Sequence, residues 1–483
     1  MAAVSSHEVF KRCCTRTPSE LPLVVQRIHD APREQEMVTR RSPATHSLLL
    51  PLRCVDRLWL ELPMRTNAYR AYSFVLRDCP PSLDRTLKLG LSKCLEHSPS
   101  FSFLSGRYDC EARGIIDSNE GIPFTTAGVA HALDDELAAS EDLLYRLADL
   151  RLPGDVKAHR APLMTISLCT FARGAAVLTV SASHAVLDGE ALMAFVACWA
   201  AYTREGAAHE AFAPALVHRL GRAPAAAASV ADSPCKSWLI AQLFALSTRE
   251  FLGTLGQLPR SARCPLSRPC VEISGAVLRR VKAAAAPVPP AWVSTQEALA
   301  AQVMLLMWSQ IADPAKECAR CSFWLGGRKY VGDSADPAAN YLYVQDVTVP
   351  AATLREGLKA VALCLHDGLQ QVNAAEMESK AAKVEATGVK LAPIVELFSS
   401  LKDPPTCAFH FKLNNLSKIP LPTFGASGQA VSTHALAMGG PTGLLASPDG
   451  GVRMFLQKES LPSKMTAEEL ASLMRQSDDF KAA

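Results

Sequence analysis

The strongest constraint on the fold is the segment Val177–Trp199, where a strand-like apolar run leads through a short loop into a helix-like pattern. The run Ala176–Val180 is apolar except for Thr179, and we read it as a buried strand. After the loop, bulky apolar residues occur at Leu192, Phe195 and Trp199, a spacing that places them on one face of a helix. Because strand and helix patterns also alternate along the rest of the chain, the sequence predicts an α/β fold.

The loop of this segment carries two chemically useful side chains, His184 and Asp188, and ends at Gly189. Loops between a strand and a helix often carry catalytic groups, because the core holds the flanking elements while the loop stays open to substrate. A neutral imidazole accepts a proton from a hydroxyl or an amine near pH 7, so His184 is a candidate general base. The spacing alone leaves open whether Asp188 orients the imidazole or braces the loop.

A second His-x-x-x-Asp pattern begins at His131, so the spacing by itself is weak evidence for a site. This copy has no apolar strand before it and no glycine after Asp135, and it falls where a polar helix is expected to begin. We therefore expect His131 to be a solvated surface residue. The corresponding structural explanation for His184 is a core histidine that is hydrogen-bonded near the end of a strand.

Length and composition limit the other classes of function. A chain of 483 residues with 49% hydrophobic content exceeds what one core usually organises, which predicts two domains. A formal net charge of +3 leaves no basic footprint for nucleic acid. The longest apolar stretches, Ala191–Tyr202 and Ala298–Trp308, fall short of the roughly 20 residues of a membrane-spanning helix. The N-terminus has no secretory apolar core, so we expect a cytoplasmic protein without a membrane span.

The cysteines and serines suggest only weak alternatives. The 15 cysteines form no disulfide framework and are expected to be reduced thiols. The pair Cys318 and Cys321 is the only C-x-x-C, and without a second ligand pair it predicts no metal site, which leaves a redox role as a minor alternative. The stretch Gly425–Gly428 resembles a serine elbow around Ser427 only loosely, so a serine hydrolase is also a minor alternative.

The chain divides into four predicted parts. Residues 1–47 are read as an irregular extension, 48–205 as the N-terminal domain with His184, 206–236 as an Ala-rich crossover linker, and 237–483 as the C-terminal domain. Strands are predicted at 71–77, 113–119, 162–173, 175–183, 271–274, 321–325, 341–349, 407–413 and 451–456, and helices at 83–95, 134–150, 190–202, 237–251, 294–308 and 354–372. The helix at 294–308 is expected to begin with a capping box, from Ser294 to Glu297.

In chain order, these landmarks resemble the BAHD family of acyl-CoA-dependent acyltransferases. The resemblance covers about Leu48 to Leu461 and includes trichothecene-acetyltransferase-like fungal and hydroxycinnamoyltransferase-like plant members. The matching residues are Pro51–Asp56, Leu83–Leu95, Leu104–Arg107, Asn119–Phe124, Pro162-Leu163, Phe171–Gly174, His184–Gly189, Ser294–Trp308, Arg328 and Asn340.

The resemblance implies two α/β domains of similar size and chloramphenicol-acetyltransferase-like fold, with mixed sheets, flanking helices and an active site in a channel between them. It also implies an acyltransferase of specialised metabolism that is a cytoplasmic monomer. Its co-substrate would be acyl-CoA and its acceptor a small-molecule alcohol or amine, with no permanently bound cofactor and no metal. His184 would be the general base without an acyl-enzyme, and Asp188 would point away and pair with Arg328, with Gly189 as structural support.

Two late segments depart from the pattern of the family. The family usually carries Asp-Phe-Gly-Trp-Gly where this chain has Thr423–Gly428. Phe424 and Gly425 are kept, and the resemblance implies a structural role for them. Upstream, Asn415 falls where the family often has a residue that helps to bind the oxyanion, and its amide is a candidate donor.

Two other functions remain open. The condensation domains of peptide synthetases share the His-x-x-x-Asp-Gly pattern and accept acyl groups from carrier proteins, but they usually have a second histidine where this chain has Ser183. The other alternative is an inactive protein that binds acyl-CoA or a small hydrophobic molecule. Intact His184, Asp188, Gly189 and Arg328 favour an enzyme.

Overall fold

The structure is a computed structural model of the chain. It describes residues 31–41, 49–51, 60, 69–205 and 269–480, except for the following positions within these ranges: 99, 112–113, 135–137, 139–140, 149–155, 157–160, 288, 290, 312, 314, 327–341, 373–405, 425–428, 437–441, 457–460, 463–464 and 478–479.

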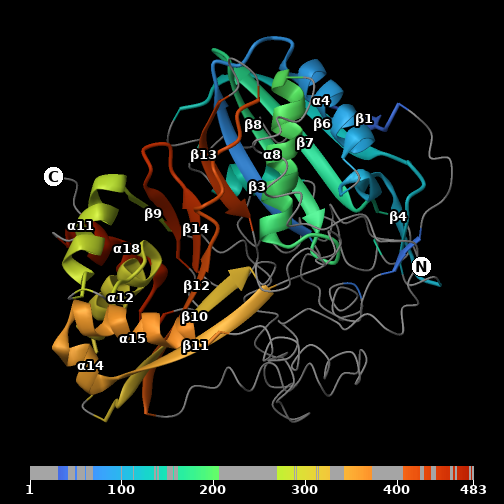
Figure 1. The fold of residues 1–483 in the computed structure, drawn as a ribbon. Helices are drawn as coiled ribbons and strands as arrows, with labels where there is room; N and C mark the ends of the chain where they lie inside the picture. The colour runs from blue at the N-terminus through green and yellow to red at the C-terminus, as the bar shows by residue number, and fades with distance from the viewer. Residues whose placement is uncertain are drawn as a thin grey trace, which may run out of the picture.

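The first large sheet has six strands in the order β1-β6-β7-β8-β3-β13 and occupies the upper part of Figure 1. Its neighbours are antiparallel except for β6 and β7, which are parallel. The strands are β1 (Arg33–Val38), β3 (Tyr69–Arg77), β6 (Ile122–Ala132), β7 (Met164–Ala172), β8 (Ala175–Ser183) and β13 (Gln429–Leu436). β8 lies between two partners and is buried at every position, including Thr179, Ser181 and Ser183.

Two helices, α4 (Leu83–His97) and α8 (Gly189–Glu205), pack against each other and against this sheet. The predicted apolar face of α8 is buried, because Leu192, Phe195 and Trp199 are all 0% exposed. The Trp199 indole also donates a hydrogen bond of 2.9 Å to the Leu87 carbonyl on α4. The helix pattern found in the sequence therefore forms the core beneath the first sheet.

The second large sheet has six strands in the order β11-β10-β12-β14-β15-β9. It is mixed as well, because β12 is parallel to both β10 and β14 while the other neighbours are antiparallel. Its strands are β9 (Cys270–Ile273), β10 (Cys318–Gly326), β11 (Leu342–Pro350), β12 (Cys407–Asn415), β14 (Thr442–Ala446) and β15 (Val452–Phe455). The helices grouped beside it in Figure 1 are α11 (Gly275–Ala285), α12 (Thr295–Trp308), α14 (Ala351–Glu356), α15 (Leu358–Gln370) and α18 (Ala467–Gln476).

The predicted α/β fold with mixed sheets and flanking helices is confirmed. The capping box of α12 is also confirmed, because the Ser294 hydroxyl accepts from the Glu297 amide and the Glu297 carboxylate accepts from the Ser294 amide. The remaining elements are a short helix, α6 (Glu141–Leu147), one 3-10 turn, and a small sheet of β2 (Leu49–Pro51), β5 (Gly114–Ile116) and β4 (Arg107–Asp109).

The last strand of the first sheet comes from the second half of the chain. β13 pairs antiparallel with β3, from Gln429 opposite Arg77 to Leu436 opposite Ala71. The two halves thus share one sheet, which the pattern of the sequence did not reveal. The predicted linker, residues 206–236, and the predicted helix at 237–251 lie outside the described residues, so the domain boundary stays a prediction.

The prediction of an irregular segment over residues 1–47 is wrong for its end, because β1 is a strand at the edge of the first sheet. Five of its six side chains are exposed and only Val38 is buried. An edge strand of this kind is held by its backbone pairing to β6, so it carries no alternating apolar pattern that could predict it.

Two predicted helices also differ from the structure. The helix expected at 354–372 is divided into α14 and α15 by Gly357, whose φ of 98° lies in the region that favours glycine. Within the helix expected at 134–150, the described residues contain the shorter α6. His131 lies near the end of β6 instead of at the start of a helix, although it is exposed as predicted.

Candidate active site

A tight hairpin brings His184 to the end of a central strand. β7 and β8 pair antiparallel along their whole length, and the turn between them is made by Arg173 and Gly174, with φ values of 63° and 68°. Positive φ values of this kind are typical of the tight turns that connect the strands of a hairpin. At the other end, the Ser183 amide donates to the Leu163 carbonyl at 2.8 Å, which fixes the backbone just before His184.

The loop from His184 to Asp188 is almost completely buried. His184 and Asp188 are 6% and 5% exposed, and Ala185, Val186 and Leu187 between them are 0% exposed. The amides of Val186 and Leu187 donate to the Ser183 carbonyl at 3.1 and 3.3 Å, which closes the loop into a turn. The backbone and the apolar side chains of the loop therefore fix where the imidazole lies.

Asp188 caps the helix that follows. Its Oδ1 accepts a hydrogen bond of 2.9 Å from the Ala191 amide, and its carbonyl accepts from the Leu192 amide, also at 2.9 Å. A side-chain oxygen in this position satisfies one of the free amides at a helix N-terminus, and a negative charge there is favoured by the helix dipole. One of the two roles left open by the sequence, bracing of the loop, thus has a direct structural basis.

Gly189 is required for space and not for backbone conformation. Its φ is outside the positive region, but an added Cβ would lie 2.9 Å from the Tyr72 hydroxyl and 3.1 Å from Cδ1 of Leu416. Tyr72 is on β3, whereas Leu416 follows directly after β12 in the second half of the chain. The two halves therefore meet at the first residue of α8.

A second contact between the halves lies one residue further along. At the end of β10, Gly326 packs so closely against Oε2 of Glu190, in the first turn of α8, that a Cβ there would overlap with it. The C-terminal ends of β10 and β12 thus both reach the N-terminus of α8. The first half supplies His184 through the continuous chain, while the second half closes against it by packing.

Asn415 ends β12, next to the contact between Leu416 and Gly189. Its Nδ2 donates to Oε1 of Gln296 at 3.2 Å, and its Oδ1 accepts from the amide and the hydroxyl of Ser417 at 2.9 and 2.6 Å. Gln296 lies in the first turn of α12, and its own Nε2 is buried without a hydrogen bond. Sequence reasoning missed Gln296. It lies inside the capping-box pattern, which indicates the start of a helix and gives no sign of a chemical role for Gln296.

Phe424 lies against the helix that begins at the site. Its ring packs edge-on against Trp199, with ring centroids 5.1 Å apart, and the carbonyl of the preceding Thr423 accepts from Arg204 at 2.9 Å. The segment that departs from the family pattern thus holds the second half against α8. Gly425, Ser427, Arg328 and Asn340 lie outside the described residues.

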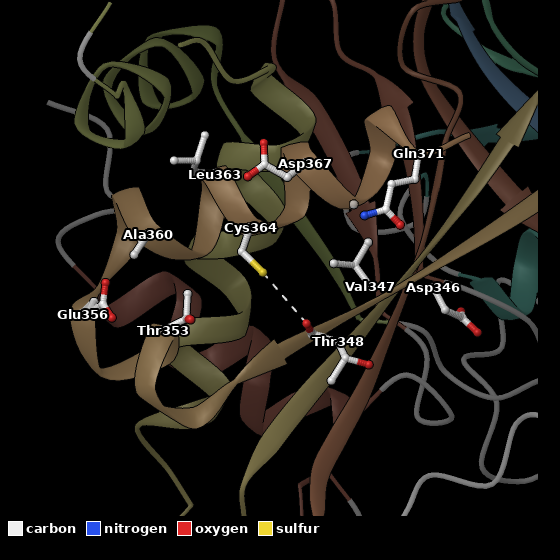
Figure 2. Close-up of a pocket in the computed structure, with 11 residues that line it drawn as sticks. Asp346, Val347, Thr348, Thr353, Glu356, Ala360, Leu363, Cys364, Asp367 and Gln371 are labelled. Carbon is white, nitrogen blue, oxygen red and sulfur yellow. Dashed lines mark hydrogen bonds between the residues drawn. The ribbon is translucent and has the colours of Figure 1, made fainter. Parts of the chain in front are cut away.

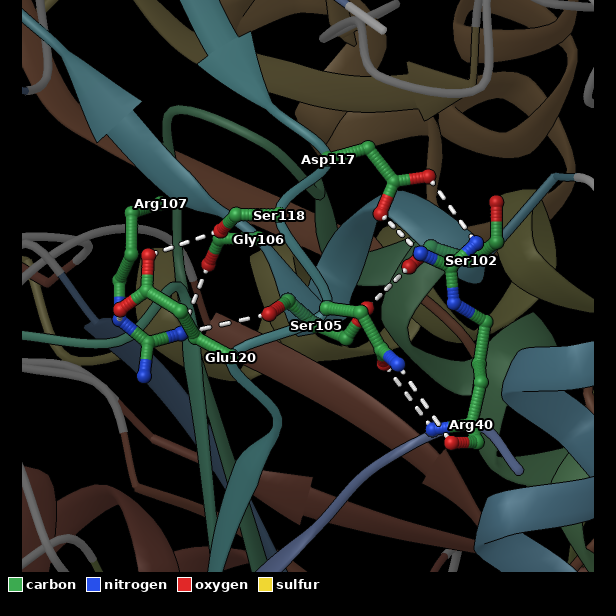
Figure 3. A network of polar contacts seen from close by, with 9 residues as sticks. Arg40, Ser102, Ser105, Gly106, Arg107, Asp117, Ser118 and Glu120 are labelled. Atoms are coloured by element: carbon green, nitrogen blue, oxygen red, sulfur yellow. Dashed lines mark hydrogen bonds and ion pairs between the residues drawn. The ribbon is translucent and has the colours of Figure 1, made fainter. Parts of the chain in front are cut away.

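A network of ion pairs ties together the landmarks at residues 104–107 and 119–124 (Figure 3). Arg107 donates to the carbonyls of Gly106 and Gly121 at 2.8 and 3.1 Å and pairs with Glu120 at 3.2 Å. Nearby, Arg40 pairs with Asp117 at 2.7 Å. Burial raises the pKa of Asp117, and the Arg40 charge partly offsets that rise.

The second sheet carries a polar cluster of its own. Ser322 on β10 is hydrogen-bonded to both Asp346 on β11 and His410 on β12, and Arg320 pairs with Asp346 at 2.8 Å. Burial favours a raised pKa for Asp346, but hydrogen bonds from His410 and Ser322 and the Arg320 charge outweigh it and lower that pKa. These residues cross-link three neighbouring strands and contain none of the predicted site residues.

A cavity of about 500 Å³ lies between β11 and the helices α14 and α15 (Figure 2). Its lining includes Asp346, Thr348, Cys364 and Asp367, and the Cys364 thiol approaches the Thr348 carbonyl at 3.9 Å. It contains neither His184 nor Asn415. Within the part of the chain that the structure describes, no cluster of three or more metal-ligating side chains occurs.

The C-x-x-C pair does not form a thiol pair. Cys318 and Cys321 are both free and lie on the single strand β10. Side chains three residues apart on a strand point to opposite faces, so the two sulfur atoms are kept apart by the sheet. The minor redox alternative for this motif is therefore not supported.

The comparisons with known proteins agree with this architecture. Residues 32–232 match the sequence model described as the Transferase family. The predicted resemblance to BAHD-type acyltransferases and the prediction of a transferase are thereby confirmed. No curated protein matches the chain.

Three solved structures illustrate the shared fold. TRI101 of F. sporotrichioides, complexed with coenzyme A and T-2, has a TM-score of 0.63 at 15% identity, covering 90% of this chain and 98% of its own. Vinorine synthase has a TM-score of 0.58 at 15% identity, with coverages of 92% and 96%. A condensation domain of the calcium-dependent antibiotic synthetase follows at 0.52, with 15% identity and coverages of 89% and 94%. At these identities the similarity shows the fold alone.

Proposed function

We propose that this transferase-family protein moves an acyl group from acyl-CoA to a hydroxyl or amine of a small-molecule acceptor, with His184 as general base. The observation that carries the proposal is the position of His184. It lies between a fully buried strand and a capped helix, where the strand ends of the second half meet the first. TRI101, which shares the fold, was solved in complex with coenzyme A.

In the proposed reaction, the acceptor hydroxyl loses its proton to His184 as its oxygen attacks the thioester carbonyl carbon. A carbon–oxygen bond forms, and the carbonyl electron pair moves to the oxygen. When the carbonyl reforms, the carbon–sulfur bond breaks, and the imidazolium returns its proton to the CoA thiolate. No acyl-enzyme is needed, and general-base catalysis of this kind contributes about 10²–10⁴-fold in rate.

The proposed role of Asp188 is to hold the loop of His184. Its cap on α8 supports this role directly, and the proposal adds a pair between its carboxylate and Arg328. Gly189, Phe424 and Gly425 would act in the same structural sense, Gly189 by leaving room for Tyr72 and Leu416.

The oxyanion of the tetrahedral intermediate would receive a hydrogen bond from the second half. Asn415 is the first candidate, and its amide nitrogen is now engaged by Gln296. The buried Nε2 of Gln296 is a second candidate, because a donor without a partner can donate a hydrogen bond to negative charge that develops nearby.

The broader proposal is a monomeric, cytoplasmic enzyme of specialised metabolism, with its active site in a channel between the two halves and with no permanently bound cofactor. Within the part of the chain that the structure describes, no helix is long and apolar enough to cross a membrane. The proposed domains are 48–205 and 237–483, joined by 206–236.

Release of the CoA thiol tests this function. We expect turnover of a short-chain acyl-CoA that depends on an added alcohol or amine, with the acylated acceptor identified by mass spectrometry. A parallel assay supplies the same acyl group on a carrier protein in place of CoA. Turnover from the carrier alone would favour the condensation-type reaction, and binding of acyl-CoA without any product across a broad acceptor panel would favour the inactive binder.

A further inference from the structure

Two buried cysteines connect the helices that cover the first sheet. Cys94 on α4 and Cys198 on α8 are 104 residues apart in the sequence, and their sulfur atoms lie 3.8 Å apart. Both thiols are free, and their residues are 0% and 4% exposed. The proposed acyl transfer uses neither of them.

The two helices cross unusually closely at this point. A Cβ on Gly90 would lie 2.8 Å from the Thr203 Cα, so only a glycine fits there without a shift of the backbone. Gly90 is one turn from Cys94, and Thr203 is little more than one turn from Cys198. A disulfide needs Cα atoms within about 7 Å of each other, and this crossing brings the two helix backbones close enough to place both cysteines on the same contact line.

The surroundings of the pair distinguish the two thiols. Cys94 donates to the Cys198 sulfur, and the Ser98 hydroxyl lies 3.2 Å from the same atom. The hydrogen bond from Cys94, followed by that from Ser98, lowers the pKa of Cys198 against the effect of burial. Burial raises the pKa of Cys94. Cys198 has two hydrogen-bonding neighbours and is the more exposed of the two residues, so we assign it as the attacking thiol and Cys94 as the thiol that resolves it.

We propose that Cys94 and Cys198 are a redox pair that hydrogen peroxide converts to a disulfide across α4 and α8. In the first step the Cys198 sulfur attacks peroxide, a sulfur–oxygen bond forms, the oxygen–oxygen bond breaks and water leaves. In the second, Cys94 loses its proton and attacks the sulfenic sulfur, and a second water leaves. Two thiols and one peroxide give one disulfide and two waters.

The disulfide would join the two ends of a segment that contains the β7–β8 hairpin and His184. Closing a loop of this length restricts the unfolded chain, so oxidation is expected to raise the melting temperature by about 5 °C. Formation of the bond requires the sulfur atoms to close from 3.8 Å to about 2.05 Å.

The test uses the full-length, folded protein. Reduced protein is treated with hydrogen peroxide, its remaining thiols are alkylated, and its peptides are mapped by mass spectrometry without reduction. We expect one cross-linked pair of peptides that joins Cys94 to Cys198 and disappears after dithiothreitol treatment. The rise in melting temperature should be reversed by the same reductant.

Two serine variants provide the matched control. Cys198→Ser should abolish the cross-link and the rise in melting temperature, whereas Cys169→Ser, at another buried free cysteine of the same half, should keep both. The proposal is overturned if both Cys94 and Cys198 of the wild-type protein remain fully alkylated after peroxide. It is equally overturned if the cross-link forms only when the protein is first unfolded in guanidinium. The wild-type map decides the matter even if a variant fails to fold.

Discussion

The two six-stranded sheets resemble each other in size and mixed direction, but they contribute to the candidate site in different ways. In the first sheet, the buried strand β8 continues directly into His184, Asp188 and α8. The second sheet reaches the same place only at its strand ends, through Gly326 and Leu416. The comparison suggests that chain continuity fixes the reactive group, whereas packing of the second half fixes what surrounds it.

The largest effect is expected at Asp188, in the first half, where β8, the His184 loop and α8 follow one another in the chain. Asp188→Ala removes a helix cap, which lowers the free energy of unfolding by about 1 kcal/mol. It also breaks the proposed pair with Arg328, which lowers the free energy of unfolding by about 3–5 kcal/mol more. Urea unfolding of the two single variants and the double variant measures the coupling of Asp188 and Arg328.

The matched control for this loss is Ser274→Ala. Ser274 caps α11 in the second half by accepting from the Val277 amide and has no place in the proposed site. Its loss should cost only about 1 kcal/mol. If Asp188→Ala costs no more than Ser274→Ala and shows no coupling to Arg328, the proposed pair is absent.

The next effect concerns the oxyanion donor, which comes from the second half of the chain. Asn415→Asp keeps the acceptor for Ser417 but removes the amide donor, and we expect it to lower kcat about 10²-fold with little change in the KM for acyl-CoA. Gln296→Glu makes the corresponding change at the second candidate. Loss of kcat in the Gln296 variant alone would assign the role to Gln296 and contradict the assignment of Asn415.

A smaller effect is expected where the halves touch. Gly189→Ala places a methyl group against Tyr72 and Leu416 and should reduce the free energy of unfolding by about 1–3 kcal/mol. Leu416→Ala shortens one of the two neighbouring side chains, so the added methyl group should then cost less free energy of unfolding. The two changes should therefore be coupled in thermal or urea unfolding. Gly443→Ala is the control for the added methyl group itself, because nothing lies within 4 Å of its Cβ position. Additive effects of Gly189→Ala and Leu416→Ala would contradict the contact.

The last effect appears only as the pH is lowered, and it concerns β13, the strand of the second half that joins the first sheet. His434 on β13 accepts from Arg453 on β15 at 2.9 Å, and burial, with the Arg453 charge, lowers the pKa of His434 to about 3. The unfolded histidine takes up a proton below about pH 6.5, whereas the folded one stays neutral until about pH 3. Stability should therefore fall as pH falls through this window, by up to about 1.4 kcal/mol per pH unit.

Urea unfolding between pH 7 and pH 5 checks this linkage. His434→Gln keeps an acceptor for Arg453 and should flatten the pH dependence of the free energy of unfolding. The exposed His131 provides the control, and His131→Gln should leave the dependence unchanged. An equal slope in wild-type protein and His434→Gln would show that His434 is not the group responsible.

Local signals in the sequence predicted the first sheet and its helix well. The β7–β8 hairpin, the buried face of α8 and the capping box of α12 depend on residues close together in the chain, so their patterns are readable without the fold. His184 was identified for the same reason, because a buried strand, a loop and an amphipathic helix are all local features.

The contacts made by the second half depend on distant residues. No local pattern indicates that Leu416 meets Gly189, that β13 joins the first sheet or that Gln296 keeps a buried donor. β1 was not predicted because most of its side chains are exposed. The break at Gly357 was not predicted because a single glycine in a sequence does not indicate a positive φ. The sequence thus predicted the part of the site in the first half, which is formed by neighbouring residues of the chain, better than the contacts made by the second half.

Replacement of His184 by alanine, with CoA binding followed beside turnover, tests the central claim most directly. The account predicts that His184→Ala binds CoA as wild type does in calorimetry but loses about 10²–10⁴-fold in acceptor-dependent thiol release, while His131→Ala keeps both. Undiminished thiol release by His184→Ala, from folded protein of normal melting temperature, would contradict the assignment of His184 as the general base.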